Sequence, residues 1–361
     1  MNILLVTDLY PLNDTHRGIP KTIENFALSF CELGHKVTVL RADLVLNTLL
    51  RGRRIYPEKT YFRNGIKIYN KNFLLPFYFG LDFLKNEDFD VIISHMPSGS
   101  LCGAKIKKKF KKPHAAIVHS SDIEVLEKYK FFFSGALKSA LKNADITGAR
   151  SIWLRERLGL KNTFLAPSGI KKEEIIPRNE AFKKFDNIKT LKIITAASFI
   201  KRKNINLLID AIKELDMPDI TLKIFGGGRE ERALKKEARG LNIEFAGQKP
   251  RSEVLEEMRR SHVFILPSVK ETFGLSYLEA LASGCITVCS EKSGLDGWIC
   301  NLKNGFTIKP ETNDIKRVIK TIRKMSTEQM KEMSKNALKT ADELEYYKCA
   351  ENYLENIKKI L

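Results

Sequence analysis

Two glutamates, Glu271 and Glu279, stand eight residues apart in the segment KETFGLSYLEALASG (270–284). The apolar run FILPS (264–268) predicts a strand before them, and the residues from Leu275 onward predict a helix. The free backbone N–H groups and the dipole at a helix start favour a phosphate or an electron-rich sugar oxygen. Because Glu271 precedes the turn and Glu279 lies one turn inside the helix, both carboxylates can face one ligand and accept hydrogen bonds from its hydroxyl groups. Alternatively, the two glutamates bind no ligand, and one is simply an acid near the helix start while the other is solvated.

The elements that must position these glutamates form two series along the chain. Short apolar runs alternate with longer amphipathic ones, which is typical of parallel strands joined by crossover helices. In the first series we expect strands and helices at 2–7, 20–33, 36–40, 90–94, 114–118 and 131–143. In the second we expect them at 191–198, 204–215, 220–228, 229–240, 243–246, 251–260, 263–266, 275–283, 285–289 and 306–308. The charged, proline-bearing segment 171–187 between the series indicates a linker.

This organisation predicts an α/β protein with two doubly wound, Rossmann-like domains. The N-terminal domain is expected at 1–180, the C-terminal domain at 188–340, and a helix at 341–361 is expected to pack across both. A chain of 361 residues is long enough for two such domains. Because ligands of open α/β sheets bind outside the carboxyl ends of the strands, we expect both domains to face a central cleft.

The charge balance of the chain is strongly basic. Its 62 lysines and arginines exceed its 43 acidic residues by 19, which suits nucleic acid, an anionic membrane or phosphorylated substrates as partners. No helix-turn-helix, RNA-binding aromatic pattern or zinc spacing is visible, so we expect no nucleic-acid partner. No apolar run reaches the length of a membrane span, and the first residues predict a buried strand rather than a secretory signal. We therefore expect a cytoplasmic location.

The basic charge is concentrated in residues 104–142, which hold ten lysines and three acidic residues. The lysines of 105–112 precede an apolar series formed by Tyr129, Phe131, Phe132, Phe133, Leu137 and Leu141. Lysines and interfacial aromatic side chains together can hold a protein reversibly on an anionic bilayer. The segment therefore predicts peripheral binding at the inner face of the cell membrane. In the alternative, the apolar residues pack on the sheet and the lysines are only solvated.

The segment 270–284 resembles the E-x7-E signature of retaining glycosyltransferases of family 4, which have the two-domain GT-B fold. The resemblance implies that Glu271 contacts the donor sugar and that Glu279 holds the nucleotide ribose. It also implies that backbone amides between the two glutamates touch the sugar and the phosphate. These amides belong to Phe273, Gly274 and Leu275.

Further segments of the second half are similar to the same family. AASFIKRKNINLLIDAI (196–212) resembles a family strand, loop and helix in which an arginine and a lysine grip the diphosphate. Lys203 matches the lysine, whereas Ser198 stands at the arginine position, so Lys201 or Arg202 must replace that contact. FAGQKP (245–250) resembles a glycine loop beside the nucleobase, where Lys249 would offer backbone groups.

The resemblance extends into the first half. The segment 8–40 is similar to the family's first loop and helix, in which a glycine lets the backbone approach the donor diphosphate, and Gly18 takes that place. The family also has a histidine at a strand end near the transferred sugar, and AAIVHSSD (115–122) supplies His119. His119 and Glu271 are thus the expected catalytic residues. Retention by same-face attack lets the leaving phosphate oxygen take the acceptor proton, so no general base is assigned; Asp122 is the nearest alternative.

The resemblance implies a retaining glycosyltransferase that moves a sugar from a nucleotide, most simply UDP, to a hydroxyl of a glycan or lipid-linked acceptor in bacterial surface polysaccharide, lipopolysaccharide or glycoconjugate synthesis. It implies no metal and no cofactor, because Asp88 and Asp90 spell D-x-D only at a strand entry. Two alternatives stay open. A GT-B nucleotide-sugar epimerase would have no acceptor, and a nonenzymatic polyanion-binding protein would need neither glutamate.

Overall fold

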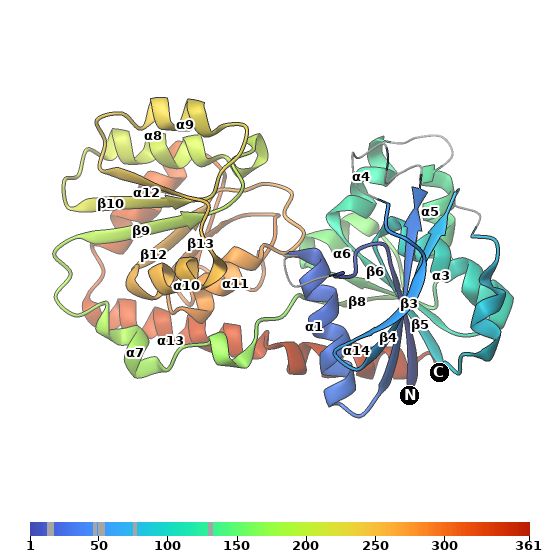
Figure 1. Ribbon diagram of the computed structural model, residues 1–361. Coiled ribbons are helices and arrows are strands. Elements are labelled where there is room, and N and C mark those ends of the chain that lie inside the picture. The colour runs from blue at the N-terminus through green and yellow to red at the C-terminus, as the bar shows by residue number, and fades with distance from the viewer. Residues whose placement is uncertain (13–17, 46–48, 50–54, 75–77, 129–132) are drawn as a thin grey trace. The chain divides into compact units, whose positions relative to one another are not determined.

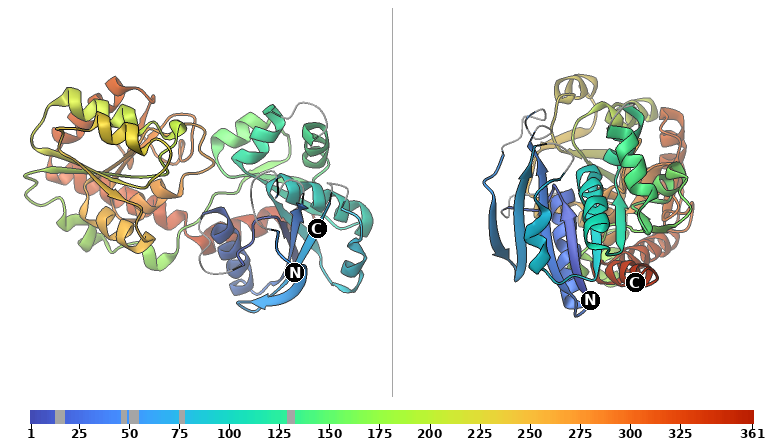
Figure 2. Two further views of the ribbon diagram at one scale, coloured as in Figure 1. Left: turned by 45° about the horizontal axis from the view of Figure 1, so that its top comes forward. Right: turned by 90° about the vertical axis from the view of Figure 1, so that its right-hand side faces the viewer.

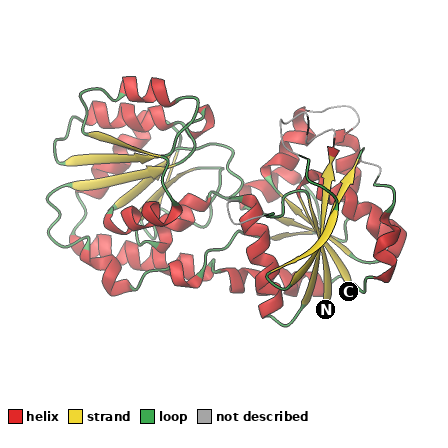
Figure 3. Ribbon diagram, viewed as in Figure 1, coloured by secondary structure: helices red, strands yellow, loops and turns green. Residues whose placement is uncertain are grey.

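The computed structural model describes residues 1–12, 18–45, 49, 55–74, 78–128 and 133–361. The chain forms two compact units, the first of residues 1–168 with 346–361 and the second of residues 169–345 (Figure 1). In each unit a sheet lies between layers of helices (Figure 3). Among the described residues, no helix has the length and apolar character needed to cross a bilayer.

The first unit contains an eight-stranded sheet in the order β3-β4-β2-β1-β5-β6-β7-β8. Its strands are β1 (Asn2–Thr7), β2 (Lys36–Leu44), β3 (Lys59–Arg63), β4 (Ile66–Phe73), β5 (Val91–His95), β6 (His114–Val118), β7 (Ile146–Ala149) and β8 (Thr163–Leu165). Its α-helices are α1 (Ile19–Glu32), α3 (Met96–Phe110), α4 (Ser120–Lys128), α5 (Phe133–Lys142), α6 (Ile152–Leu158) and α14 (Tyr346–Lys358). All neighbouring strands are parallel except β3 and β4, whose hairpin forms one edge of the sheet (Figure 2).

The second unit contains a six-stranded parallel sheet in the order β11-β10-β9-β12-β13-β14. Its strands are β9 (Leu191–Ala196), β10 (Ile220–Phe225), β11 (Ile243–Gly247), β12 (Val263–Leu266), β13 (Ile286–Ser290) and β14 (Gly305–Ile308). Its α-helices are α7 (Arg178–Lys183), α8 (Ile205–Leu215), α9 (Glu231–Glu237), α10 (Arg251–Arg260), α11 (Leu275–Ala282), α12 (Thr312–Arg323) and α13 (Thr327–Glu343). This strand order is that of a Rossmann fold, with a topological switch point between β9 and β12.

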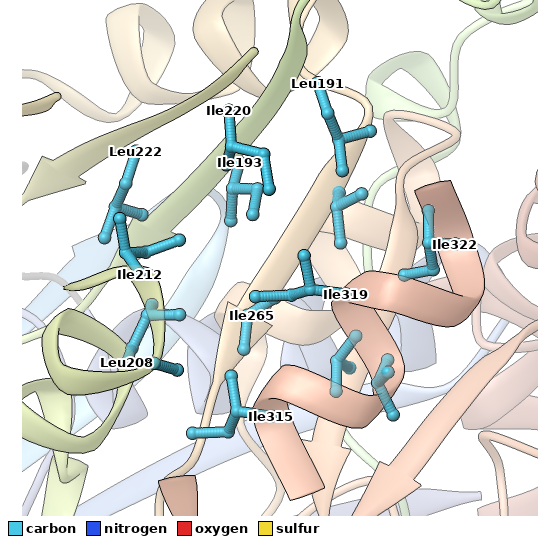
Figure 4. Close-up of a cluster of buried hydrophobic side chains, with 14 of the residues drawn as sticks. Leu191, Ile193, Leu208, Ile212, Ile220, Leu222, Ile265, Ile315, Ile319 and Ile322 are labelled. Atoms are coloured by element: carbon cyan, nitrogen blue, oxygen red, sulfur yellow. The ribbon is translucent and has the colours of Figure 1, made fainter. Parts of the chain in front are cut away.

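The core of the second unit shows why these segments form these elements. Aliphatic side chains of the strands meet those of α8 and α12 in one cluster (Figure 4). Ile193 and Ile265 come from the sheet, whereas Leu208 and Ile319 come from the helices, and all four are at most 1% exposed. The inner strands β12 and β13 are buried at every position, as expected of parallel strands covered on both faces.

The structure corrects the expected domain boundaries. The first unit ends at Ser168 rather than at residue 180, and the expected linker 171–187 belongs to the second unit. The reason is packing, because Ile176 and Ala181 are buried with Leu338 of α13, and the Ile176 N–H donates to the carbonyl oxygen of Ala282 (3.0 Å). The expected helix at 341–361 is divided between the units, since residues 346–361 belong to the first.

Helix α14 completes the core of the first unit by packing on α1 (Figure 1). The ring of Tyr353 stacks on Phe26 with 4.6 Å between ring centroids and meets Phe164 edge-on. The Tyr353 hydroxyl also accepts a hydrogen bond from Nη1 of the fully buried Arg150 (2.7 Å). This aromatic packing explains why the tail helix is held by the first unit.

Candidate functional site

The loop between β12 and α11 opens the helix that carries the spaced glutamates. Gly274 caps α11 with φ 86°, a left-handed conformation that glycine adopts without steric cost. A Cβ at this position would lie 2.4 Å from the ring of Tyr277, whose hydroxyl donates to the carbonyl oxygen of Leu266 (2.7 Å). The turn is thus packed against the end of β12. Phe273 is buried just before it, and Leu275 is the first residue of α11.

Glu271 lies at the centre of a cluster of hydrogen-bond donors. The residue is 6% exposed, and its Oε1 accepts from the Ser268 hydroxyl (2.5 Å), Nη1 of Arg202 (3.0 Å) and Nζ of Lys203. Its backbone N–H donates to Oγ of Ser293 (2.9 Å). Two of the predicted donor-site residues, Lys203 and Glu271, are therefore in direct contact.

The topology of the second sheet explains how this contact arises. Lys203 follows β9 and Glu271 follows β12, so both stand at the carboxyl ends of the two strands that flank the switch point. The loop after β9 is tied to the loop after β12, because the Val269 N–H donates to the carbonyl oxygen of Arg202 (2.9 Å) and Nδ2 of Asn204 donates to that of Pro267 (2.9 Å). Of the two replacements expected for the missing arginine, both are exposed, and Arg202 contacts Glu271.

The electrostatics of the cluster favour an ionised carboxylate. Burial alone would raise the pKa of Glu271, but Lys203 and Arg202 outweigh it and hold that pKa below its ordinary value. Burial lowers the pKa of Lys203, and Glu271 opposes that shift. An ammonium group has three donors, so Lys203 can serve Glu271 and a second anion together.

Glu279 lies in a separate network on α11. Its Oε1 accepts from Nε of Arg251 (2.6 Å), and the two terminal nitrogens of Arg251 grip both carboxylate oxygens of Glu174. The Glu279 side chain is 16% exposed. Burial raises its pKa, and the charge of Arg251 opposes the rise.

The glycine loop after β10 brings the backbone of three strands together. Gly226 has φ 135°, and a Cβ there would lie 1.9 Å from the carbonyl oxygen of Ala197, so only glycine fits. Its N–H donates to the carbonyl oxygen of Gly247 at the end of β11 (2.9 Å). Lys249 follows that strand, and its exposed side chain pairs with Glu253 (3.4 Å) rather than with Glu271 or Glu279.

Gly18, the predicted glycine of the first unit, caps α1. It has φ 69° and ψ −133°, and no described atom lies within 4 Å of the place where a Cβ would stand. Its carbonyl oxygen accepts from the N–H of Thr22 (3.0 Å). Whether its backbone meets the donor diphosphate stays a prediction.

His119 is buried at the carboxyl end of β6 beside a second histidine. Its Nε2 lies 3.3 Å from Nδ1 of His95, which ends β5. Nη2 of Arg150 also lies 3.3 Å from that Nδ1. Because a guanidinium can only donate, Nδ1 of His95 must accept, and His119 must carry its proton on Nε2. Burial and the charge of Arg150 hold the pKa of His119 well below its usual value, so the ring is neutral.

Asp122, the alternative base, is fully buried on α4. Its Oδ2 accepts from the backbone N–H of His119 (2.9 Å). Burial raises the pKa of Asp122 to about 8, against the lowering effect of that hydrogen bond. The carboxyl group therefore stays protonated up to neutral pH.

Asp88 and Asp90 stand at the entry to β5, as predicted. Their side chains accept from Nδ2 and from the backbone N–H of Asn2, at 2.6 and 2.7 Å, at the amino end of β1. Among the residues that the structure describes, no group of three or more His, Cys, Asp or Glu side chains is placed to hold a metal ion.

Several residues of these networks were missed from the sequence. His95 ends a predicted strand in the same way as His119, and that signal could have identified it. Arg150 follows β7, a four-residue strand that the apolar pattern did not predict. Arg251 and Glu174 carry no motif, because 77 residues separate them.

Comparison with known proteins identifies the family. The model of glycosyl transferases group 1 matches residues 177–340, and that of Glycosyltransferase Family 4 matches residues 16–164. An uncharacterized glycosyltransferase of Methanocaldococcus jannaschii is 30% identical over 274 residues, 71% of this chain and 73% of its own. The putative teichuronic acid biosynthesis glycosyltransferase TuaC of Bacillus subtilis is 24% identical over 86% of both chains.

A solved structure shows the same fold over the whole chain. HepE of Anabaena, crystallised with UDP and glucose, superposes with a TM-score of 0.70 and 16% identity, covering 99% of this chain and 100% of its own. The chain belongs to the GT-B glycosyltransferases of the family 4 type and is a glycosyltransferase. The predicted family, fold and enzyme class are confirmed.

Proposed function

We propose that the chain transfers a sugar from a UDP-sugar to a hydroxyl of a glycan or lipid-linked acceptor, with retention of the anomeric configuration. The observation that carries this proposal is the contact of Glu271 with Lys203 at the switch point of the second unit. A carboxylate that can accept from sugar hydroxyls lies there beside cations that can meet a diphosphate. HepE, which has the same fold, was crystallised with UDP and glucose, and this supports the choice of donor.

Each donor group in the second unit has an assigned task. Lys203 and Arg202 meet the charge that develops on the leaving diphosphate, together with the N–H groups at the start of α11. Glu271 holds sugar hydroxyls, Glu279 holds the ribose, and the backbone at Lys249 lies beside the base. The protein needs no metal and no cofactor, because the cations and amides supply the positive charge.

The first unit is assigned to the acceptor, with His119 at the transferred sugar. With its proton on Nε2 and donated to His95, His119 has its Nδ1 lone pair left to accept from a hydroxyl. The acceptor proton passes to the leaving phosphate oxygen during same-face attack. Because this route needs no protein base, Asp122 is given no catalytic role.

The acceptor belongs to bacterial surface polysaccharide, lipopolysaccharide or related glycoconjugate synthesis at the inner face of the cell membrane. Two observations support this choice. TuaC, similar over most of its length, is named for teichuronic acid biosynthesis. The lysines of 105–112 give the first unit a basic surface that suits anionic headgroups and pyrophosphate.

A screen of nucleotide sugars tests the proposal. Thermal shift should identify a UDP-sugar, and mass spectrometry with candidate acceptors should then show an added hexose and released UDP. NMR of the product should show the anomeric configuration of the donor. Conversion of the UDP-sugar to its epimer without an acceptor would favour the epimerase alternative. Activity should persist in EDTA, and its loss on chelation with rescue by manganese would contradict metal-independent transfer.

A further inference from the structure

A groove of about 920 Å³ lies on the first unit between α3 and α5. Its apolar lining comes from Leu101, Ala104, Phe133, Ala136 and Ala140, and its basic lining from Lys105, Lys107, Lys108, Lys111 and Lys112. Asp145 is the acidic residue in the lining that the structure describes. We call this feature the lysine groove. Tyr129, Phe131 and Phe132, which the sequence placed in the same surface, lie outside the described residues.

The lysine groove lies at the amino ends of the strands, whereas the predicted acceptor site lies at their carboxyl ends. Its residues Pro113 and Asp145 come directly before β6 and β7, whereas His119 follows the carboxyl end of β6. A strand rises roughly 3.3 Å per residue, so the five residues of β6 separate the two ends by about 16 Å. A ligand in the lysine groove therefore does not occupy the acceptor site.

Most of the positive charge in the lysine groove is uncompensated. Lys107 is paired, since its ammonium donates to Oδ1 of Asp145 (2.7 Å) and to the carbonyl oxygen of Asn143 (2.7 Å). Lys105, Lys108, Lys111 and Lys112 form no ion pair with any described residue, whereas Lys109, outside the lysine groove, pairs with Asp82. The lining thus combines four unpaired lysines with apolar side chains.

Lys111 occupies a backbone position that favours glycine. It is the C-cap of α3 with φ 56° and ψ 37°, and its N–H donates to the carbonyl oxygen of Lys107 (2.9 Å). Glycine is the common residue in such a left-handed cap, because a Cβ is strained there. A lysine at this position adds charge to the rim at the expense of stability.

We propose that the lysine groove binds an anionic phospholipid of the membrane surface, with its phosphate among the lysines and the start of an acyl chain on the apolar floor. Lysines are compact point charges that suit mobile lipid phosphates, and the described lining contains no arginine fork for rigid phosphate recognition. Phe133 is the one aromatic ring in that lining, which offers little stacking surface for nucleic acid. The inference deepens the proposed membrane location but does not require the UDP-sugar assignment.

Calorimetry with short-chain lipids below their micelle concentration tests the proposal on the full chain. Dihexanoyl phosphatidylglycerol should bind with a stoichiometry of one, and dihexanoyl phosphatidylcholine should bind at least about tenfold more weakly, because lysines favour the anionic headgroup. Glycerol phosphate should also bind more weakly, because it lacks the chains. Equal affinity for glycerol phosphate or tighter binding of an oligonucleotide would overturn the proposal.

Matched variants place the site. Lys105→Glu/Lys108→Glu should lower phosphatidylglycerol affinity by about tenfold or more, since each removed lysine also leaves a negative charge. Lys138→Glu/Lys142→Glu, exposed on α5 but outside the lysine groove, makes the same charge change and should have a much smaller effect. Equal losses in the two pairs would indicate diffuse attraction and contradict a discrete site.

Two further variants separate binding from folding. Ala136→Trp should fill the lysine groove and weaken the lipid without weakening glycerol phosphate. Lys111→Gly should raise the melting temperature by relieving the left-handed cap, yet weaken phosphatidylglycerol binding. A more stable variant with unchanged lipid affinity would contradict the role of Lys111. UDP binding should be the same in all these variants, so failure of the donor proposal would show in the wild type and leave lipid binding intact.

Discussion

Nζ of Lys203 donates to Oε1 of Glu271, and this contact joins the loop after β9 to the residue that follows β12. The Lys203 side chain is 12% exposed and that of Glu271 8% exposed, so solvent screens the pair little. The pair thus serves the structure of the second unit as well as the proposed chemistry.

Breaking this pair from one side should be costly. We expect Glu271→Leu to lower the free energy of unfolding by about 3 kcal/mol, because the buried Lys203 loses its counter-charge. Lys203→Met/Glu271→Leu should be less destabilised than the sum of its single variants. Urea unfolding of the full double-mutant cycle gives the coupling, and additive losses would show that the two charges do not depend on each other.

Lys203 should also distinguish a diphosphate from a bare nucleoside. Lys203→Ala should weaken UDP about tenfold or more, because a charge-assisted hydrogen bond contributes roughly 1.5 to 3 kcal/mol, and should leave uridine almost unchanged. Lys201→Ala, exposed in the same loop, is the control and should have little effect. Calorimetry of UDP and uridine measures both, and equal losses would refute the diphosphate contact.

Glu279 should govern affinity for the ribose. We expect Glu279→Ala to weaken UDP by about 1.5 to 3 kcal/mol, because a carboxylate that accepts from ribose hydroxyls is lost. The same variant should lose less affinity for a deoxyribose analogue of UDP than for UDP itself. Lys249→Ala should bind UDP normally, because only the backbone of Lys249 is assigned a contact and its side chain pairs with Glu253. Unchanged UDP affinity in the Glu279 variant would remove the ribose role.

Gly274 should tolerate no side chain. Gly274→Ala should lower the free energy of unfolding by about 2 kcal/mol or more, through the left-handed φ and a contact of 2.4 Å with Tyr277. Gly159→Ala is a suitable control, because φ is 58° there but no described atom lies within 4 Å of the added Cβ. Gly159→Ala should lower the free energy of unfolding by about 1 kcal/mol. Equal losses in thermal unfolding would mean that the Tyr277 ring moves aside.

Asp122 should make stability depend on pH. Burial raises its pKa to about 8, above the value in the unfolded chain. The contribution of Asp122 to the free energy of unfolding is therefore complete at acid pH and is lost as the pH rises through 8. Asp122→Asn removes this titration. The melting temperature of the variant should therefore rise relative to the wild type between pH 5 and pH 9. A difference in melting temperature between Asp122→Asn and the wild type that stays constant over this pH range would contradict the raised pKa of Asp122.

Much of the fold follows from local pattern, and the exceptions have physical causes. The strands His114–Val118 and Val263–Leu266 were predicted with their observed bounds, because fully buried parallel strands are continuous apolar runs. The hairpin of β3 and β4 was missed. Its edge strand Lys59–Arg63 begins and ends with a charged residue and has no buried position, so it lacks an apolar run. The packing of 171–187 depends on Leu338, which no local pattern reveals.

In the candidate site, too, local motifs predict some residues, and the packing of distant segments decides the others. Lys203 and Glu271 were each predicted from spaced motifs, and the switch point of the sheet brings them together. Arg251 was not predictable, because its pairing with Glu174 and Glu279 is fixed by the packing of distant segments. The tautomer of His119 likewise depends on Arg150, which contacts His95 from the loop after β7.

The place of α14 decides the order in which the two units can finish folding during synthesis. Residues 346–361 leave the ribosome after all of residues 169–345, yet their Tyr353 covers Phe26 of the first unit. The half that is translated first therefore cannot complete its core until translation has passed Tyr353, whereas the second unit can close earlier. Nascent chains of residues 1–168 will therefore leave the ring of Phe26 without its Tyr353 partner, so this apolar surface stays exposed while the second unit is translated.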